Sequence, residues 1–161
     1  MWHLTSTGGL VSLSRASKTD EKTLAFRKPP SRAVCREKIL GKLVVIVEDE
    51  PNIAESLSFI LGRAGFEIVC VDDGNDAIFE IKNRHPSLVI LDVMLPNRSG
   101  LEILRDIRAA PGIASTPVLM LSAKGQTKDK DIAVESGADH YMVKPFSNRE
   151  VVDQVTRLAG G

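Results

Sequence analysis

Short apolar runs alternate with segments of helical periodicity along residues 43–158. The first run, Leu43–Val47, is continuous and β-branched, which is typical of a strand buried on both faces of a sheet. From Pro51 to Ala64, apolar residues recur every three or four positions, which predicts an amphipathic helix. Gly65 follows at the position where a helix commonly ends.

The same alternation continues to the end of the chain. Further strands are predicted by apolar runs at residues 66–71, 88–91, 118–121 and 141–143. Further helices are predicted by apolar spacing around residues 77–81, 101–107, 132–136 and 151–158. Five strands that alternate with five helices predict an α/β fold, in which a parallel sheet carries helices on both faces.

Two common nucleotide-binding motifs are missing from this pattern. No GxGxxG follows the first predicted strand, which argues against a dinucleotide site. No GxxxxGK[ST] occurs in the sequence, which argues against a P-loop.

Composition limits the kind of core that the chain can build. Hydrophobic residues make up 43% of the 161 residues and aromatic residues only 4%, so the core must be aliphatic. Cys35 and Cys70 lie far apart, and Cys70 falls in an apolar run, where we expect a buried free thiol. This cysteine usage favours a reducing, cytoplasmic location. No apolar run approaches the roughly 18–20 residues of a membrane helix, so we expect no membrane association.

Charge divides the chain into two parts although the formal net charge is zero. Residues 1–40 hold eight basic and three acidic residues, a net +5, and residues 41–161 hold thirteen basic and eighteen acidic residues, a net −5. We expect a basic, disordered extension over 1–40 and one domain over 41–161. A transit peptide, a basic arm and a non-functional extension are all compatible with the first part. The acidic second part argues against direct nucleic-acid binding.

Polar residues stand at the ends of four predicted strands. In chain order these residues are Glu48, Asp49, Glu50, Asp92, Ser122 and Lys144. The carboxyl ends of parallel strands lie along one edge of a sheet, and ligands bind there where the strand order reverses. With the order 2-1-3-4-5, the first and third strands adjoin at that point. Glu48, Asp49 and Asp92 would then form one acidic cluster.

This cluster has a specific chemistry. Three neighbouring carboxylates repel one another, and a divalent cation relieves the repulsion. Oxygen ligands without histidine or cysteine favour Mg²⁺, which commonly shares its shell with a phosphate. Lys144 adds a positive charge for a phosphoryl oxygen, and Ser122 adds a hydroxyl donor. These residues predict a phosphoryl-binding site with a carboxylate nucleophile. An acid in this run could also simply stand at a helix N-terminus, where the helix dipole favours a negative charge. We assign this role to Glu50.

Four motifs at these strand ends resemble the response-regulator receiver domain of two-component signalling. They are Val47–Pro51 (VEDEP), Leu91–Pro96 (LDVMLP), Leu121–Lys124 (LSAK) and Lys144–Phe146 (KPF). The resemblance runs from about Lys42 to Leu158. It implies a flavodoxin-like, doubly wound, five-stranded parallel sheet of order 2-1-3-4-5 with five helices.

The resemblance also implies roles for the acidic residues. Asp92 stands at the position of the phosphoacceptor. Glu48 and Asp49 resemble the acidic pair that organises Mg²⁺, with Asp92 and the backbone carbonyl of Met94 completing the protein's share of the metal ligands.

Three further residues match family positions. Lys144 resembles the lysine that contacts the phosphoryl group, and its bond to Pro145 is usually cis in the family. Ser122 and Tyr141 resemble the pair that switches conformation: the hydroxyl moves toward the phosphoryl group and the ring turns inward. A simpler interpretation of Tyr141 is a strand aromatic with no switching role.

The resemblance implies a signalling protein rather than an enzyme. A sensor histidine kinase or a phosphotransfer protein would donate the phosphoryl group to Asp92. A downstream protein would read the result on the face of the fourth helix, fifth strand and fifth helix. The charged and polar residues that we place on this face are Lys128, Lys130, Asp131, Glu135, Asp139, His140, Arg149, Glu150 and Gln154.

The same face forms dimers in the DNA-binding branch of the family. Lys130, Glu135 and Glu150 resemble parts of that charged pattern. Gln154 stands where an arginine is expected, however, and His140 replaces an acid. We therefore expect a monomer, with weak dimerisation only after phosphorylation.

Two other functions remain as alternatives. One is a phosphatase-type enzyme with Asp92 as a transient nucleophile, but the haloacid-dehalogenase pattern DxDx[TV] needs a second acid where Met94 stands. The other is a receiver-like binding module that no longer cycles phosphate, against which the intact Asp49, Asp92 and Lys144 argue.

Overall fold

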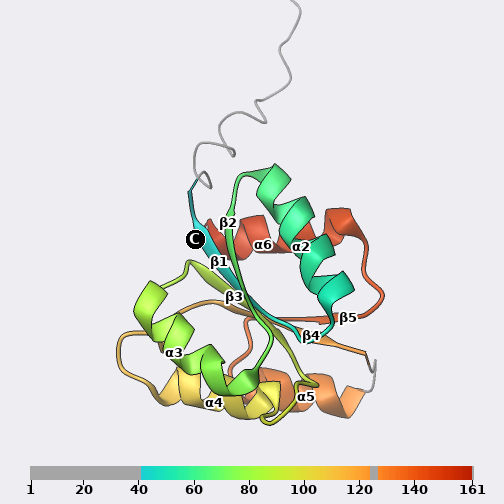
Figure 1. Cartoon of the computed structure of the whole chain (residues 1–161). Coiled ribbons are helices and arrows are strands. Elements are labelled where there is room, and N and C mark those ends of the chain that lie inside the picture. The colour runs from blue at the N-terminus through green and yellow to red at the C-terminus, as the bar shows by residue number, and fades with distance from the viewer. Residues whose placement is uncertain (1–40, 124–126, 161) are drawn as a thin grey trace, which may run out of the picture. The chain divides into compact units, whose positions relative to one another are not determined.

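A computed structural model describes residues 41–123 and 127–160, which form a five-stranded parallel sheet with five helices (Figure 1). The strands are β1 (Leu43–Val47), β2 (Glu67–Val71), β3 (Leu88–Asp92), β4 (Val118–Ser122) and β5 (His140–Val143). The helices are α2 (Pro51–Ala64), α3 (Gly74–Arg84), α4 (Gly100–Ala109), α5 (Thr127–Glu135) and α6 (Asn148–Ala159). The strand order β2-β1-β3-β4-β5 confirms the predicted doubly wound topology. The extension predicted over residues 1–40 lies outside the described residues.

Two apolar layers, one on each face of the sheet, hold the domain together. Successive side chains of a strand point to opposite faces, so β1 contributes to both layers. Figure 1 shows α2 and α6 on one side of the sheet and α3, α4 and α5 on the other. Val44 and Ile46 pack with α2 and α6, whereas Val45 and Val47 pack with α3 and α4. All four side chains are fully buried, and each contributes about 1.5–3 kcal/mol of hydrophobic stabilisation.

Local signals in the sequence explain where the helices begin and end. Pro51 opens α2, and Gly65 ends it in a left-handed conformation with φ 106°. Ser99 and Glu102 form a capping box at the start of α4, in which each side chain accepts a hydrogen bond from the other residue's backbone. Capping of this kind fixes α4 directly after the loop that leaves β3.

The prediction of a buried Cys70 is wrong, because its side chain is exposed and its Sγ lies 3.1 Å from Ser58 Oγ. Cys70 belongs to β2, which is an edge strand that pairs with β1 alone in the described sheet. Helices cover an edge strand less completely than a central one. An apolar run therefore does not ensure burial at this position.

The helices of residues 41–123 and 127–160 include none that is both long enough and apolar enough to cross a membrane.

Candidate functional site

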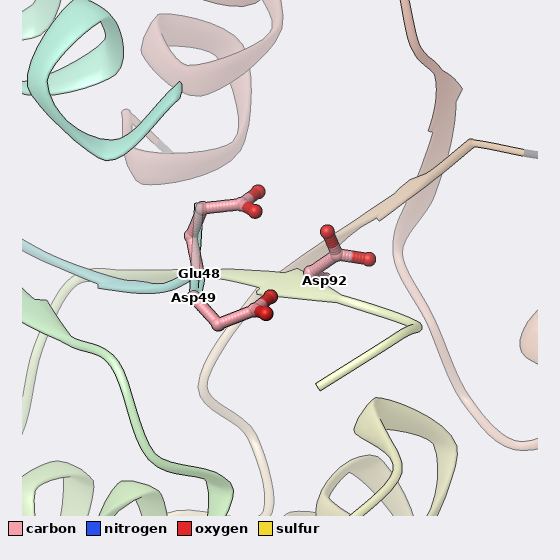
Figure 2. Close-up of side chains that lie close together, drawn as sticks. All are labelled: Glu48, Asp49 and Asp92. Atoms are coloured by element: carbon pink, nitrogen blue, oxygen red, sulfur yellow. The ribbon is translucent and has the colours of Figure 1, made fainter. Parts of the chain in front are cut away.

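The acidic cluster lies at the carboxyl edge of the sheet, where β1 and β3 run side by side. Their register pairs Val47 with Leu91, so the residues that follow these two positions are neighbours. Figure 2 shows that Glu48 and Asp49, from the end of β1, and Asp92, the last residue of β3, lie close together. One carboxylate oxygen from each residue can be chosen so that all three lie within 4.8 Å of one another. The structure thus brings together the three acids that the sequence predicted to meet.

Burial makes this cluster electrostatically unfavourable without a cation. Glu48 is 2% exposed and Asp92 is 3% exposed, whereas Asp49 is exposed. Glu48 Oε2 is buried and accepts no hydrogen bond among the described residues, although Lys144 Nζ lies 2.8 Å away as an ion-pair partner. A buried carboxylate oxygen of this kind is a ready metal ligand. The all-oxygen donor set of the cluster fits Mg²⁺.

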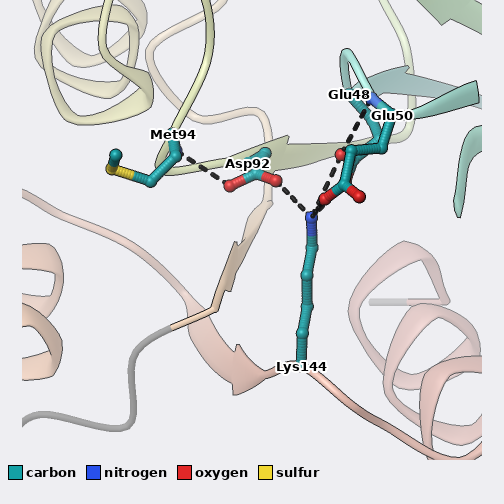
Figure 3. Close-up of polar contacts among 5 residues, drawn as sticks. All are labelled: Glu48, Glu50, Asp92, Met94 and Lys144. Carbon is teal, nitrogen blue, oxygen red and sulfur yellow. Dashed lines mark hydrogen bonds and ion pairs between the residues drawn. The ribbon is translucent and has the colours of Figure 1, made fainter.

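Lys144 supplies the positive charge of the site from the position directly after β5. Figure 3 shows its ammonium group pointing at Asp92, Glu48 and Glu50. Nζ forms a close ion pair with Asp92 Oδ2 and donates a hydrogen bond of 3.0 Å to Glu48 Oε1. It lies 3.5 Å from Glu50 Oε1, and its own side chain is only 11% exposed. The Lys144–Pro145 peptide is cis, as the resemblance implied.

Glu50 lies at the N-terminus of α2, where it was predicted, and it also contacts Lys144. It stands at the N-cap position of α2, but its side chain makes no capping hydrogen bond. The carboxylate reaches Lys144 instead, although 63% of the side chain is exposed. No sequence signal separates this role from the helix-end role, because both need only an acid before Pro51.

Burial and mutual charge shift the pKa values of this site. Burial raises the pKa of Glu48 to about 7, and the neighbouring Asp92 charge adds to this against the hydrogen bond from Lys144. Burial by itself would lower the pKa of Lys144, but hydrogen bonds to Asp92 and Glu48 outweigh it and raise that pKa. The lysine therefore stays charged at neutral pH.

The backbone around Asp92 orients its carboxylate. Met94 N donates a hydrogen bond of 2.8 Å to Asp92 Oδ1, and Lys144 Nζ contacts the other carboxylate oxygen, Oδ2 (Figure 3). Gly100, the first residue of α4, packs directly on this strand end. A Cβ atom built on Gly100 would lie 1.9 Å from the backbone oxygen of Asp92. The sequence pattern predicted a helix around residues 101–107 and did not indicate this close packing at Gly100, since glycine is common before a helix for its backbone freedom alone.

The predicted switch residues lie on the two neighbouring strands. Ser122 ends β4 and is 2% exposed, and its carbonyl oxygen accepts a hydrogen bond of 2.7 Å from Lys144 N. Tyr141 in β5 pairs with Met120 of β4. Its side chain is 9% exposed and lies in the apolar layer beneath α3, α4 and α5. In this structure the ring is already inside the domain.

An open pocket of about 480 Å³ adjoins the lysine on the side of α2. The residues that line it are Glu50, Asn52, Ile53, Ser56, Ala123, Lys144, Pro145 and Phe146. Of the residues around the acidic cluster, Lys144 and Glu50 are the two that line this pocket.

The raised pKa of Glu48 predicts a pH-dependent stability in the absence of divalent cations. The folded domain holds the Glu48 proton up to about pH 7, whereas the unfolded chain releases it near the ordinary value of 4.5. The stabilisation is therefore complete below about pH 4.5 and is lost as the pH rises through about 7. Glu48→Gln removes this pH-dependent loss. The free energy of unfolding of the variant, relative to that of the wild type, should therefore rise by about 1–3 kcal/mol from pH 4.5 to pH 8. Urea unfolding in EDTA at both pH values measures the difference in the free energy of unfolding between variant and wild type. A difference that is the same at both pH values would contradict the prediction.

The fold and the site together define a class of protein: an open α/β domain with an acidic cluster and a lysine at the carboxyl edge of its sheet. Residues 44–156 match the family model of the response regulator receiver domain. The chain therefore belongs to the response-regulator receiver family, and the sequence-based assignment is confirmed.

Solved structures agree with this assignment. A protein from Chloroflexus aurantiacus that is classed as a response regulator is 32% identical, with a TM-score of 0.72, and the match covers 75% of this chain and 99% of that one. The receiver domain of the Francisella response regulator 1452 is 29% identical, with a TM-score of 0.70 and coverage of 74% and 97%.

A third similar structure contains a metal ion. It is the receiver domain of a Pseudomonas aeruginosa sensor histidine kinase, and it has a magnesium ion coordinated in its active-site cleft. It is 26% identical to this chain, with a TM-score of 0.70, and the match covers 75% of this chain and 99% of that one.

Proposed function

We propose that this chain accepts a phosphoryl group on Asp92 from the phosphohistidine of a sensor histidine kinase or a phosphotransfer protein. The observation that carries the proposal is the placement of the Asp92 carboxylate. It is held between the Met94 amide and the Lys144 ammonium, beside two further acids (Figure 3). Phosphoryl uptake from a small-molecule donor tests the proposal directly, and its expected result opens the Discussion.

Glu48, Asp49 and Asp92 would hold Mg²⁺ together with the backbone carbonyl of Met94. The all-oxygen donor set and the burial of Glu48 and Asp92 support this assignment, and the magnesium ion in the similar Pseudomonas domain supports it independently. When bound, the cation would supply charge stabilisation on the oxygens of the transferring phosphoryl group.

The residues of the chain account for the remaining chemistry. An oxygen of Asp92 forms the new bond to phosphorus while the bond between phosphorus and the donor imidazole nitrogen breaks, and the electron pair returns to the imidazole. A carboxylate that is ionised needs no general base for this step. Lys144, which already contacts Asp92 and Glu48, is placed to contact a phosphoryl oxygen and to offset its charge.

Phosphorylation would then bias a conformational equilibrium that involves Ser122 and Tyr141. The Ser122 hydroxyl lies at the end of a strand that adjoins β3, and it would move toward the phosphoryl group. That movement would favour an inward position of the Tyr141 ring, and the low exposure of Tyr141, 9%, is compatible with such a position. The event is a shift between two populations, driven by a local change in charge.

The output surface that we propose is the face of α5, β5 and α6, which binds a downstream protein. One of its predicted charges is engaged in contacts within the domain: Asp139 Oδ2 accepts hydrogen bonds from Arg108 at 2.8 Å and from Val118 N at 2.7 Å. Gln154 accepts a hydrogen bond of 2.6 Å from Arg157. The side chain of Lys128 lies outside the described residues.

The same elements also expose apolar side chains. Ile132 of α5 and Val143 of β5 are each 39% exposed. A mixed surface of this composition suits a transient protein interface better than a permanent one.

We predict a monomer before phosphorylation and at most weak dimerisation after it, because Gln154 and His140 depart from the charged pattern of family dimers. Sedimentation with and without a beryllofluoride mimic of the phosphoryl group measures this. A tight activated dimer that is lost on charge reversal at Lys130 or Glu150 would contradict the prediction and make dimerisation the output.

We predict that the phosphorylated state lasts minutes or longer. In this family, the residues two positions after the phosphoacceptor and two positions after the switch hydroxyl shape the path of the hydrolytic water. Here they are Met94, whose side chain is 62% exposed, and Lys124, which lies outside the described residues. Neither is an acid or a carboxamide that orients a water molecule. Decay measured after removal of the phosphodonor checks the lifetime, and loss within seconds would contradict it.

A further inference from the structure

The loop between β3 and α4, residues 93–99, carries the Met94 carbonyl and has a tight turn at its centre. Pro96 O accepts a hydrogen bond of 2.6 Å from Arg98 N, which closes a three-residue turn around Asn97. Asn97 has a φ of 64°, a value that is uncommon outside glycine although asparagine adopts it more readily than most residues. Residues in such conformations persist when surrounding contacts hold them.

Side-chain contacts hold this turn against two helices. Arg98 forms a close ion pair with Asp106 of α4, and Asn97 contacts the start of α3. Asn97 Nδ2 donates a hydrogen bond of 3.0 Å to Asp73 Oδ2. The other oxygen of the same carboxylate, Oδ1, accepts a hydrogen bond of 2.8 Å from Asn75 N and so caps α3. The start of α3 also abuts the loop backbone, since a Cβ atom built on Gly74 would lie 2.8 Å from Arg98 O. Asp73 thus connects the rigid end of a helix to this turn.

We propose that Asp73 and Asn97 are positioning residues for the metal site, a role that rests on the function proposed above. Met94 stands three residues before Asn97, and its amide is already fixed on Asp92 Oδ1. Residues 94–97 are therefore held at both ends: the Met94 amide is bound to Asp92, and the Asn97 side chain is bound to Asp73. Loss of the Asp73 contact leaves the turn with fewer anchors, chiefly the ion pair of Arg98 with Asp106. The added freedom would let the Met94 carbonyl, which the proposed function assigns to the metal, shift its position.

Two substitutions separate this role from general effects on folding. Asn97→Gly removes the side-chain hydrogen bond, but glycine adopts the required φ without strain. Asp73→Ser keeps an N-cap oxygen for α3 but is too short to serve both partners. Asp76→Asn is the matched control, because it removes one charge from the first turn of the same helix without touching the loop.

The experiment is a titration of each variant with MgCl₂, followed by the amide chemical shifts of residues 92–95. Asn97→Gly and Asp73→Ser should each raise the Mg²⁺ dissociation constant about 3- to 10-fold. The double variant should show no further rise, since both changes break the same contact. Asp76→Asn should stay within about twofold of the wild type.

Each other outcome counts against the proposal. An unchanged dissociation constant in Asn97→Gly overturns it, and so do additive effects in the double variant. A lower metal-free melting temperature with an unchanged dissociation constant shows a purely structural contact and overturns it as well. A wild type that binds no Mg²⁺ overturns the metal site itself, and that failure is distinct because it appears before any variant is made.

Discussion

Asp92→Ala should gain no phosphoryl group from acetyl phosphate and MgCl₂ under conditions in which the wild type gains one. The variant lacks the proposed nucleophile, and no other acid of the described site faces both Met94 N and the Lys144 ammonium (Figure 3). Losing a nucleophile lowers a group-transfer rate by on the order of 100-fold or more. Intact-mass analysis measures the uptake directly.

Matched variants make this result specific. Asp72→Ala removes an exposed acid from the loop after β2 and should be phosphorylated like the wild type. Asp49→Ala should lose both Mg²⁺ binding and phosphorylation, because it removes one of the three clustered carboxylates. Normal phosphorylation of Asp92→Ala would refute the assigned acceptor. Normal Mg²⁺-dependent phosphorylation of Asp49→Ala would refute the assigned metal ligand.

Gly100→Ala should destabilise the domain by about 2–4 kcal/mol and lower phosphoryl uptake at the same time. The added methyl group would lie 1.9 Å from Asp92 O, 2.8 Å from Asp92 C and 3.1 Å from Val93 Cα. All three atoms belong to the backbone, so no side-chain rotation relieves the overlap. Either α4 or the end of β3 must move, and a movement of β3 displaces Asp92, the proposed phosphoacceptor. Urea unfolding and intact-mass analysis on the same preparation measure both effects.

Gly62→Ala is the control, because the same substitution should act in the opposite direction. Gly62 lies within α2, and nothing lies within 4 Å of the position of its added Cβ atom. Alanine favours a helix over glycine by about 0.5–1 kcal/mol, so this variant should be slightly more stable than the wild type. Equal stability of Gly100→Ala and the wild type would show that the packing of α4 against Asp92 adjusts freely.

Much of the candidate site was predictable because its residues stand at strand ends. A strand run such as Leu43–Val47 identifies its own carboxyl end, and parallel topology brings all such ends to one edge. Glu48 and Asp92 therefore had to lie near each other once the strand order was assumed. The observed strand order β2-β1-β3-β4-β5 is the order that was assumed.

Other features depend on how far helices cover the sheet, and periodicity does not contain that information. Cys70 lies in an apolar run but is exposed, because β2 is an edge strand. Tyr141 is an isolated strand aromatic in the sequence, and packing alone places its ring in the layer beneath α3, α4 and α5.

The sequence by itself determined the alternation of strands and helices, the family and the residues that meet at the carboxyl edge, because these follow from local periodicity and from residues at fixed places in the topology. Only the tertiary structure decided that Glu50 turns to Lys144, that Gly100 packs on Asp92 O, and that Asp73 holds Asn97. Each of these contacts joins segments whose separation depends on side-chain packing to within an ångström. A pattern of residue types along the chain does not specify distances of that size.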